Sequence, residues 1–460
     1  MFVPSKKCIC LGSFVAPILL YCNGAIPSSP TAEKTIEDEI TKKYHKIVER
    51  EPSNLNAHFN LGILYYNKGL YEDAIREFHT VININPKDAE AYYNLGNIFI
   101  KKNLLDDAIA TYKKTLAINL RDADAFHNLG RAYALKGMND EAISAYKRSL
   151  EINPDLADSY KSIAYLFQKT GQVSETISSF EKAADLLPED SILLFDLASF
   201  YEAKDFQDRA IATYQRIVSI NTDHKEAKNK LAILYNNKGV SLALQGNRDE
   251  AIVTYKEAIK NKENFKEAYN NLGAVYVDKE MIDEAIETYK NAIKIDPNFS
   301  EAYNNLGVAY TKKKDYDEAI SVFEKTLSLN KDHPGAHFNL GVIYAEKGMA
   351  AKAIHEYNNA LQLAPDDFTA LYNRGQLYLE SGRFNDASTD IQKIIEINPE
   401  LATAHHTLGV IYQKQGYIDK AISEYKRALE IAPEFQETLK SIEDAYRLRE
   451  KKLKNKHTEK

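Results

Sequence analysis

A 34-residue pattern recurs along most of this 460-residue chain and limits what the chain can fold into. Its clearest copy, at 268–297, places large and small residues three or four positions apart in two groups: Tyr269, Leu272, Gly273 and Tyr276, then Ala285, Tyr289 and Ala292. This spacing predicts two amphipathic helices, and the short link between them predicts an antiparallel hairpin. Because so small a unit cannot bury its apolar face alone, neighbouring units are expected to stack into one array.

The ends of the predicted helices are also encoded locally. Asp283 and Glu284 place negative charge in the first turn of the second helix, where the helix dipole favours it. Pro297 lacks an N–H donor and cannot continue that helix. One position between the two helices often holds glycine, which predicts a left-handed residue that ends the first helix. These glycines are Gly69, Gly137, Gly171, Gly246, Gly348, Gly382 and Gly416.

The recurring order of small, large, small and proline residues resembles the tetratricopeptide repeat (TPR) family, whose unit is a 34-residue helix-turn-helix. The resemblance implies an all-α fold, a right-handed superhelix or α-solenoid. Repeats 1–5 are expected at 55–224 and repeats 6–11 at 232–435, separated by an insertion at 225–231 that lengthens a helix by about two turns. Capping helices are expected at 33–54 and 436–450, and a disordered basic tail at 451–460.

The first residues predict export. Lys6 and Lys7 precede an apolar run at 8–22 and then small and polar residues, so 1–25 is interpreted as a signal peptide. An uncleaved N-terminal anchor and a lipoprotein signal at Cys22 remain open. The protein is expected to be exported, periplasmic or membrane-associated. All three cysteines, Cys8, Cys10 and Cys22, lie in this segment, so its removal leaves no thiol for a disulfide or a metal.

The remaining composition argues against catalysis. The net charge of −7 gives no basic field for nucleic acid, and no phosphate-binding loop, nucleophile elbow or His-Glu-x-x-His motif is present in the sequence. His333 and His337 are four residues apart, but Pro334 intervenes and His337 occupies a core position, so a packed histidine is favoured over a metal ligand. We therefore predict no enzyme activity, no cofactor and no metal.

The candidate binding residues are asparagines that stand two positions before the glycine of the first helix. They are Asn60, Asn94, Asn128, Asn237, Asn271, Asn305, Asn339 and Asn373. On the inner wall of a superhelix they would form a ladder, and a primary amide matches the N–H and C=O of a peptide backbone. The pattern resembles the asparagine ladder in the repeats of O-GlcNAc transferases, whose catalytic domain has no counterpart here. A purely packing role for these residues remains open.

Two further observations concern this ladder. It is interrupted at Ser162 and Asp196, so the array is expected to hold two grooves. One position before the ladder residues, several repeats carry an aromatic ring that either contacts a ligand or packs between repeats. These rings belong to Phe59, Tyr93, His127, Phe338 and Tyr372.

The sequence therefore predicts a non-enzymatic scaffold for protein–protein interactions, whose concave groove binds peptide segments or helices of partners. The alternative is an accessory subunit that recognises protein substrates for a separately encoded glycosyltransferase. Neither function involves nucleic acid, and contact with a membrane is expected only through an N-terminal anchor.

The export hypothesis can be tested by fractionating the native cell. We expect the full-length chain in the envelope or outside the cell, and a variant that lacks residues 2–25 in the cytoplasm, because the apolar run is the targeting element. Finding both forms in the cytoplasm would show that 1–25 is not a targeting signal.

Overall fold

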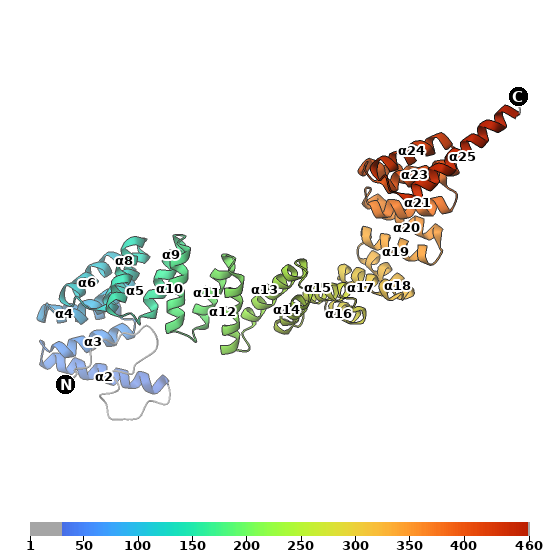
Figure 1. Cartoon of the computed structure of the whole chain (residues 1–460). Helices are drawn as coiled ribbons and strands as arrows, with labels where there is room; N and C mark the ends of the chain where they lie inside the picture. The colour runs from blue at the N-terminus through green and yellow to red at the C-terminus, as the bar shows by residue number, and fades with distance from the viewer. Residues whose placement is uncertain (1–29, 459–460) are drawn as a thin grey trace. The chain divides into compact units, whose positions relative to one another are not determined.

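The computed structural model describes residues 30–458, and within them every regular element is an α-helix, 24 in number (Figure 1). The all-α solenoid prediction is confirmed. The chain divides at His224 into two compact units, each of which is described by itself.

The first unit contains α2 to α12, in which α3 to α12 form five pairs. Their bounds are α2 Pro30–Arg50, α3 Leu55–Asn67, α4 Tyr71–Ile84, α5 Ala89–Lys101, α6 Leu105–Ile118, α7 Ala123–Leu135, α8 Asn139–Ile152, α9 Ala157–Lys169, α10 Val173–Leu186, α11 Ser191–Ala203 and α12 Gln207–Ile220.

The second unit contains six pairs, α13 to α24, and a final helix. Their bounds are α13 Lys225–Leu244, α14 Arg248–Asn261, α15 Lys266–Asp278, α16 Ile282–Ile295, α17 Ser300–Lys313, α18 Tyr316–Leu329, α19 Pro334–Glu346, α20 Ala350–Leu363, α21 Phe368–Glu380, α22 Phe384–Ile397, α23 Ala402–Lys414, α24 Ile418–Ile431 and α25 Gln436–Thr458.

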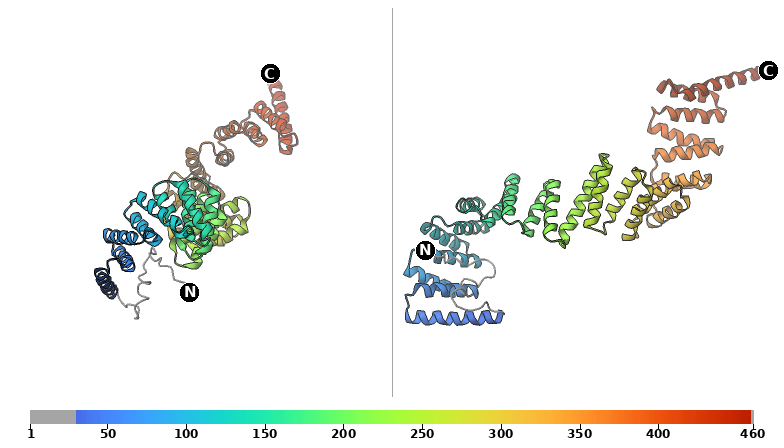
Figure 2. Two further views of the ribbon diagram at one scale, coloured as in Figure 1. Left: turned by 90° about the vertical axis from the view of Figure 1, so that its left-hand side faces the viewer. Right: turned by 60° about the horizontal axis from the view of Figure 1, so that its bottom comes forward.

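Each pair is an antiparallel hairpin, and the second helix of one repeat packs on the first helix of the next, as the repeats of either unit show in Figure 2. The buried residues between them are those of the recurring pattern, such as Leu272, Ala285, Tyr289 and Ala292 in α15 and α16. The core is therefore a continuous strip inside each unit, and each repeat shares it only with its neighbours.

The closest approach inside a repeat is between a glycine of the first helix and a ring of the second. At Gly273 an added Cβ would lie 2.6 Å from Cε1 of Tyr289, which is far inside van der Waals contact. Gly62, Gly96, Gly307 and Gly409 face the rings of Phe78, Tyr112, Phe323 and Tyr425 in the same way. A side chain at this position would separate the two helices.

The predicted left-handed residues are confirmed, since all seven glycines between the paired helices have positive φ. Four repeats place another residue in the same conformation, namely Asn103, Asp205, Glu280 and Lys314. The turn geometry is therefore common to repeats with and without glycine. The non-glycine residues adopt it at a cost of about 1 kcal/mol because their Cβ is crowded in this region.

The ends of the units differ in detail from the sequence prediction. Helix α2 begins at Pro30 and ends at Arg50, and Asn54 then caps α3 by accepting a hydrogen bond from the Ala57 N–H at 3.0 Å. The seven inserted residues 225–231 lie in α13, which has 20 residues where α15 has 13. The disordered tail predicted from 451 is wrong as far as Thr458, because α25 continues to that residue.

The long final helix has a local explanation. Its sequence after Tyr446 is rich in lysine, arginine and leucine, which favour helix. Lys452 also donates from Nζ to the carbonyl oxygen of Gly416 at 3.0 Å, which ties the helix to the preceding repeat.

A row of ion pairs 30 residues apart connects neighbouring repeats along the surface. A lysine at the end of a first helix contacts a carboxylate at the start of the preceding second helix, as in Lys313–Asp283 at 2.9 Å and Lys347–Asp317 at 2.7 Å. These pairs contribute little to stability because their carboxylates are exposed to solvent.

The segment 1–25, with its predicted signal peptide or anchor, lies outside the described residues. Among residues 30–458, no helix combines the length and the apolar character that crossing a membrane demands.

The glycine–ring contact can be tested by Gly273→Ala with Gly375→Ala as a matched control, because Gly375 faces Ile391, whose Cδ1 would be 3.3 Å from an added Cβ. Alanine gains about 1 kcal/mol of helix propensity at either site. At Gly273 we expect the overpacking against Tyr289, about 1–3 kcal/mol, to exceed that gain. Guanidinium unfolding and hydrogen exchange in α15 and α16 measure the effect. Equal stabilities for the two variants would contradict the contact.

Candidate functional site

The first helices of the repeats form the inner wall of each unit. First helices of neighbouring repeats contact one another directly, as α5 contacts α7 and as α15 contacts α17. Second helices of neighbouring repeats are not in comparable contact within residues 30–458. Each unit therefore curves with its first helices on the inside, and the ladder asparagines lie on these helices.

The ladder asparagines differ in exposure. Asn94 and Asn128 are buried, at 4% and 7% exposed, whereas Asn237 at the start of the second unit is exposed. The others are partly buried: Asn60, Asn271, Asn305, Asn339 and Asn373.

Several ladder amides donate to the preceding repeat. Asn271 donates from Nδ2 to Oδ1 of Asn236 at 3.0 Å, and Asn305 donates to Oδ1 of Asn270 at 3.0 Å. In the first unit Asn128 donates to the Tyr93 hydroxyl at 2.8 Å. Each bond joins residues 35 apart in the sequence, so these pairs form only after the repeats have stacked.

The sequence prediction missed the acceptors of this row. Asn236, Asn270 and Asn304 stand immediately before ladder asparagines, and the signal was the Asn-Asn doublet that recurs at 236–237, 270–271 and 304–305. The row ends at Asn304, whose Oδ1 is buried without a hydrogen-bond partner among the described residues. Other repeats carry an aromatic ring immediately before the ladder asparagine. One of these rings packs inside its repeat, since the ring centroids of Phe338 and Tyr357 are 5.9 Å apart.

A second polar row crosses the inner wall of the first unit. Tyr112 donates to Oδ1 of Asn97 at 2.7 Å, next to the Asn128–Tyr93 hydrogen bond. Burial raises the pKa of Tyr93 and of Tyr112 above the ordinary value of 10.0. Both hydroxyls therefore stay protonated at neutral pH; Tyr112 donates to Asn97, and Tyr93 accepts from Asn128.

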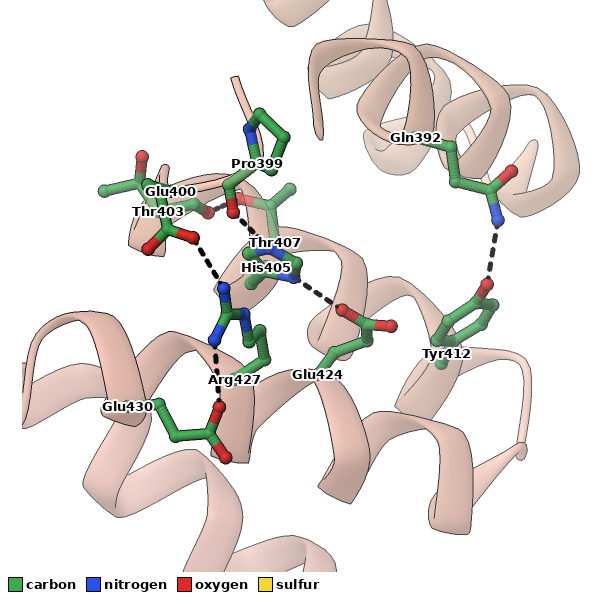
Figure 3. A network of polar contacts seen from close by, with 10 residues as sticks. All are labelled: Gln392, Pro399, Glu400, Thr403, His405, Thr407, Tyr412, Glu424, Arg427 and Glu430. Carbon is green, nitrogen blue, oxygen red and sulfur yellow. Dashed lines mark hydrogen bonds and ion pairs between the residues drawn. The ribbon is translucent and has the colours of Figure 1, made fainter. Parts of the chain in front are cut away.

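Histidines in the large core slot bind carboxylates of the second helix. His405 places Nδ1 2.7 Å from Oε2 of Glu424 and Nε2 3.1 Å from the carbonyl oxygen of Pro399 (Figure 3). His58 and Glu77 form the same pair, with the carbonyl of Pro52 as the second partner. Both ring nitrogens therefore face an oxygen of the protein, which holds the ring in one orientation.

The predicted packing role of His337 agrees with this geometry. His337 contacts Oε2 of Glu356 at 2.7 Å, while His333 caps α19 by accepting from the Ala336 N–H at 3.1 Å. The two rings thus serve different partners. Among residues 30–458, no cluster of three or more His, Cys, Asp and Glu side chains has the arrangement of a metal site.

One repeat replaces the usual leucine with a buried ion pair. Arg374 donates to both carboxylate oxygens of Asp390, at 2.9 and 2.6 Å, and to Oδ1 of Asn358 at 2.6 Å. The Asp390 side chain is 4% exposed, so losing either partner would strand a buried charge. Asp390 stands at the repeat position that Glu77, Glu356 and Glu424 occupy, and the acid in each of these repeats contacts a histidine or an arginine of the first helix.

Comparisons with known proteins agree with this fold. Tetratricopeptide repeat models match residues 42–82, 64–103, 96–137 and 123–156, and the model of the cilia and flagella-associated protein 70 C-terminal domain matches residues 234–450. Curated protein sequences contain no match to this chain.

Solved structures of similar architecture include YrrB, described as a TPR protein with an unusual peptide-binding site. It is 23% identical over 41% of this chain and 96% of YrrB, with a TM-score of 0.37. MamA is 28% identical over 36% of this chain and 99% of MamA, with a TM-score of 0.33. The Cut9–Hcn1 structure is 16% identical over 90% of this chain and 94% of the matched chain, with a TM-score of 0.39.

The partly buried His127 on the inner wall gives a prediction for how stability depends on pH. His127 contacts the Ser159 hydroxyl at 2.8 Å, and burial lowers its pKa below 6.5, with Asp158 opposing the shift. The neutral ring is therefore favoured in the folded state. Its contribution to stability is complete above about pH 6.5 and is lost as pH falls toward the lower folded-state pKa.

We expect the unfolding free energy of the wild type, measured relative to His127→Asn, to fall between pH 7.5 and 5. Asparagine keeps a polar group beside Ser159 but does not titrate. Guanidinium unfolding at several pH values measures the difference. A difference that is independent of pH would show that His127 is not held neutral.

Proposed function

Since this chain is a tetratricopeptide repeat protein, we propose that its inner walls bind extended segments of partner proteins. Repeats of this kind indicate a protein–protein interaction scaffold. The finer proposal rests on one observation, the two pairs of side-chain amides that join first helices of the second unit, Asn271 with Asn236 and Asn305 with Asn270.

The amides keep hydrogen-bonding capacity for a ligand. Asn271 uses one of its two N–H groups on Asn236 and retains the other N–H and its carbonyl oxygen. A peptide backbone offers the complementary acceptor and donor whatever its side chains are. The bond to the neighbouring repeat holds the amide in one orientation, which lowers the entropy lost when a ligand binds.

The spacing of the row suits an extended chain. Packed helices are about 8–10 Å apart, and an extended chain advances about 3.3 Å per residue, so about three residues of ligand span each repeat. One turn beyond the amides, the inner wall carries short side chains that leave the row accessible, one in each repeat: Val240, Ala274, Val308 and Val342.

The location of this scaffold remains a proposal that rests on residues 1–25. If these residues direct export, the partners belong to the cell envelope or the exterior. The alternative role beside a separately encoded glycosyltransferase predicts that enzyme among the partners, and capture from the native cell tests it.

The proposal is tested with a photoreactive amino acid at Ala274, next to the row, and mass spectrometry of the captured segment. We expect Asn271→Ala, Asn305→Ala and Asn339→Ala together to lower capture about tenfold or more, since each lost hydrogen bond costs about 0.5–1.5 kcal/mol. The control replaces three exposed asparagines outside the inner wall, Asn264, Asn291 and Asn298, and should leave capture unchanged.

A matched pair separates binding from packing. Asn236→Ala and Asn271→Ala remove the same bond between repeats, from opposite ends. They should therefore cost similar stability, about 0.5–1.5 kcal/mol, by thermal unfolding. If the ladder binds ligand, Asn271→Ala lowers capture more than Asn236→Ala does. Equal capture by the two variants would mean that the ladder only joins the repeats.

A further inference from the structure

Helix α25 occupies the place of the first helix of a further repeat. It packs on α24 through Thr438, Ile442 and Ala445, which are buried. Arg449 contacts Asp419, 30 residues earlier, at 3.8 Å, as in the row of ion pairs described above. No second helix follows α25 within residues 30–458, and α25 extends beyond α23 and α24 (Figure 1). The face of α25 that a second helix would cover is therefore open.

The open face of α25 carries apolar residues seven positions apart, at Leu439, Tyr446 and Leu453. Leu439 occupies the large core slot of the repeat, where Leu371 is 2% exposed, but Leu439 itself is 37% exposed. Leu453 is 54% exposed, and Tyr446 is partly buried. Apolar residues at this spacing on one side of a 23-residue helix are typical of the contact line of a coiled coil.

The second helix of another repeat does not fit this face. Glu443 stands at the repeat position of Gly409, where the first helix approaches a ring of the second. At Gly409 an added Cβ would lie only 2.6 Å from Cδ1 of Tyr425. A glutamate at this position excludes that approach, so repeats of two chains do not stack end to end at α25. A coiled-coil partner packs through large side chains and does not need the glycine.

One edge of the open face is available to a partner helix. The other edge, at Ile442, is buried on α24. In a parallel pair of helices opposite edges meet, whereas in an antiparallel pair the same edge of both helices meets. Two copies of α25 can therefore pair only in the antiparallel direction. The available edge is exposed and carries two cations and two anions, in the order Lys440, Glu443, Arg447 and Glu450.

This edge is complementary to a reversed copy of itself. Reversal about Tyr446 places Leu439 opposite Leu453 of the second copy. Glu443 then lies about 3 Å along the axis from Arg447 of the second copy, and Glu450 lies equally far from Lys440 of the second copy. The glutamates of the two copies also approach each other, and the cations beside them offset that repulsion.

We infer that α25 is a dimerisation helix, which pairs with α25 of a second copy in the antiparallel direction about a two-fold axis at Tyr446. The inference goes beyond the proposed function and does not depend on it, since the inner walls play no part in the contact. The interface is isologous, so it closes at two copies and does not form filaments.

The dimer is tested by sedimentation equilibrium of the full chain over a range of concentrations. The open face is small, so we expect a weak and reversible dimer. Leu453→Glu adds a charge opposite Leu439 of the second copy and should raise the dissociation constant about tenfold or more. Leu448→Glu is the control, because Leu448 is 43% exposed on the far side of α25 and should leave the dimer unchanged.

The direction of pairing is tested by disulfide formation in full chains whose Cys8, Cys10 and Cys22 are replaced by serine. A chain with Leu439→Cys should cross-link to a tagged chain with Leu453→Cys. It should not cross-link to itself, because two such cysteines are about 21 Å apart along the axis of an antiparallel pair.

Three results would overturn the inference. They are a chain that stays monomeric up to about 1 mM, a dimer that Leu453→Glu does not weaken, and Leu439→Cys that cross-links to itself more than to Leu453→Cys. If a helix of a different protein covers α25, the purified chain gives the first of these results. None of them bears on capture of segments by the inner walls.

Discussion

The contact between a glycine of the first helix and a ring of the second controls the geometry of the whole array. At Gly273 and Tyr289 the helices approach so closely that there is no room for a methyl group in place of the glycine hydrogen. Because this contact recurs in most repeats, the first helices face the same side of each unit. The inner wall and its asparagines depend on that approach together with the amide pairs between repeats.

The asparagine row shows why packing and binding need not exclude each other. An amide has two N–H donors and a carbonyl oxygen, and the bond from Asn305 to Asn270 uses one donor. The same bond that aligns the repeats also fixes the amide for a ligand. A ladder asparagine without such a bond, such as the exposed Asn237, is less restricted in orientation.

Charged side chains between the helices of a repeat have partners. Glu424 contacts His405, and the buried Asp390 pairs with Arg374, because a buried charge without a partner costs several kcal/mol.

The sequence by itself determined the helices, their left-handed ends and the repeat period, because these depend on residues within one or two helical turns. Local rules correctly predicted the left-handed conformation of Gly137 and the position of Asp283 in the first turn of its helix. The charge of the C-terminal tail predicted disorder and missed the helix that continues to Thr458. Only the tertiary structure decided which asparagines donate to which neighbours and which acid the core histidine His405 contacts. These contacts join residues 19 to 35 positions apart, and such residues meet only when helices pack and repeats stack.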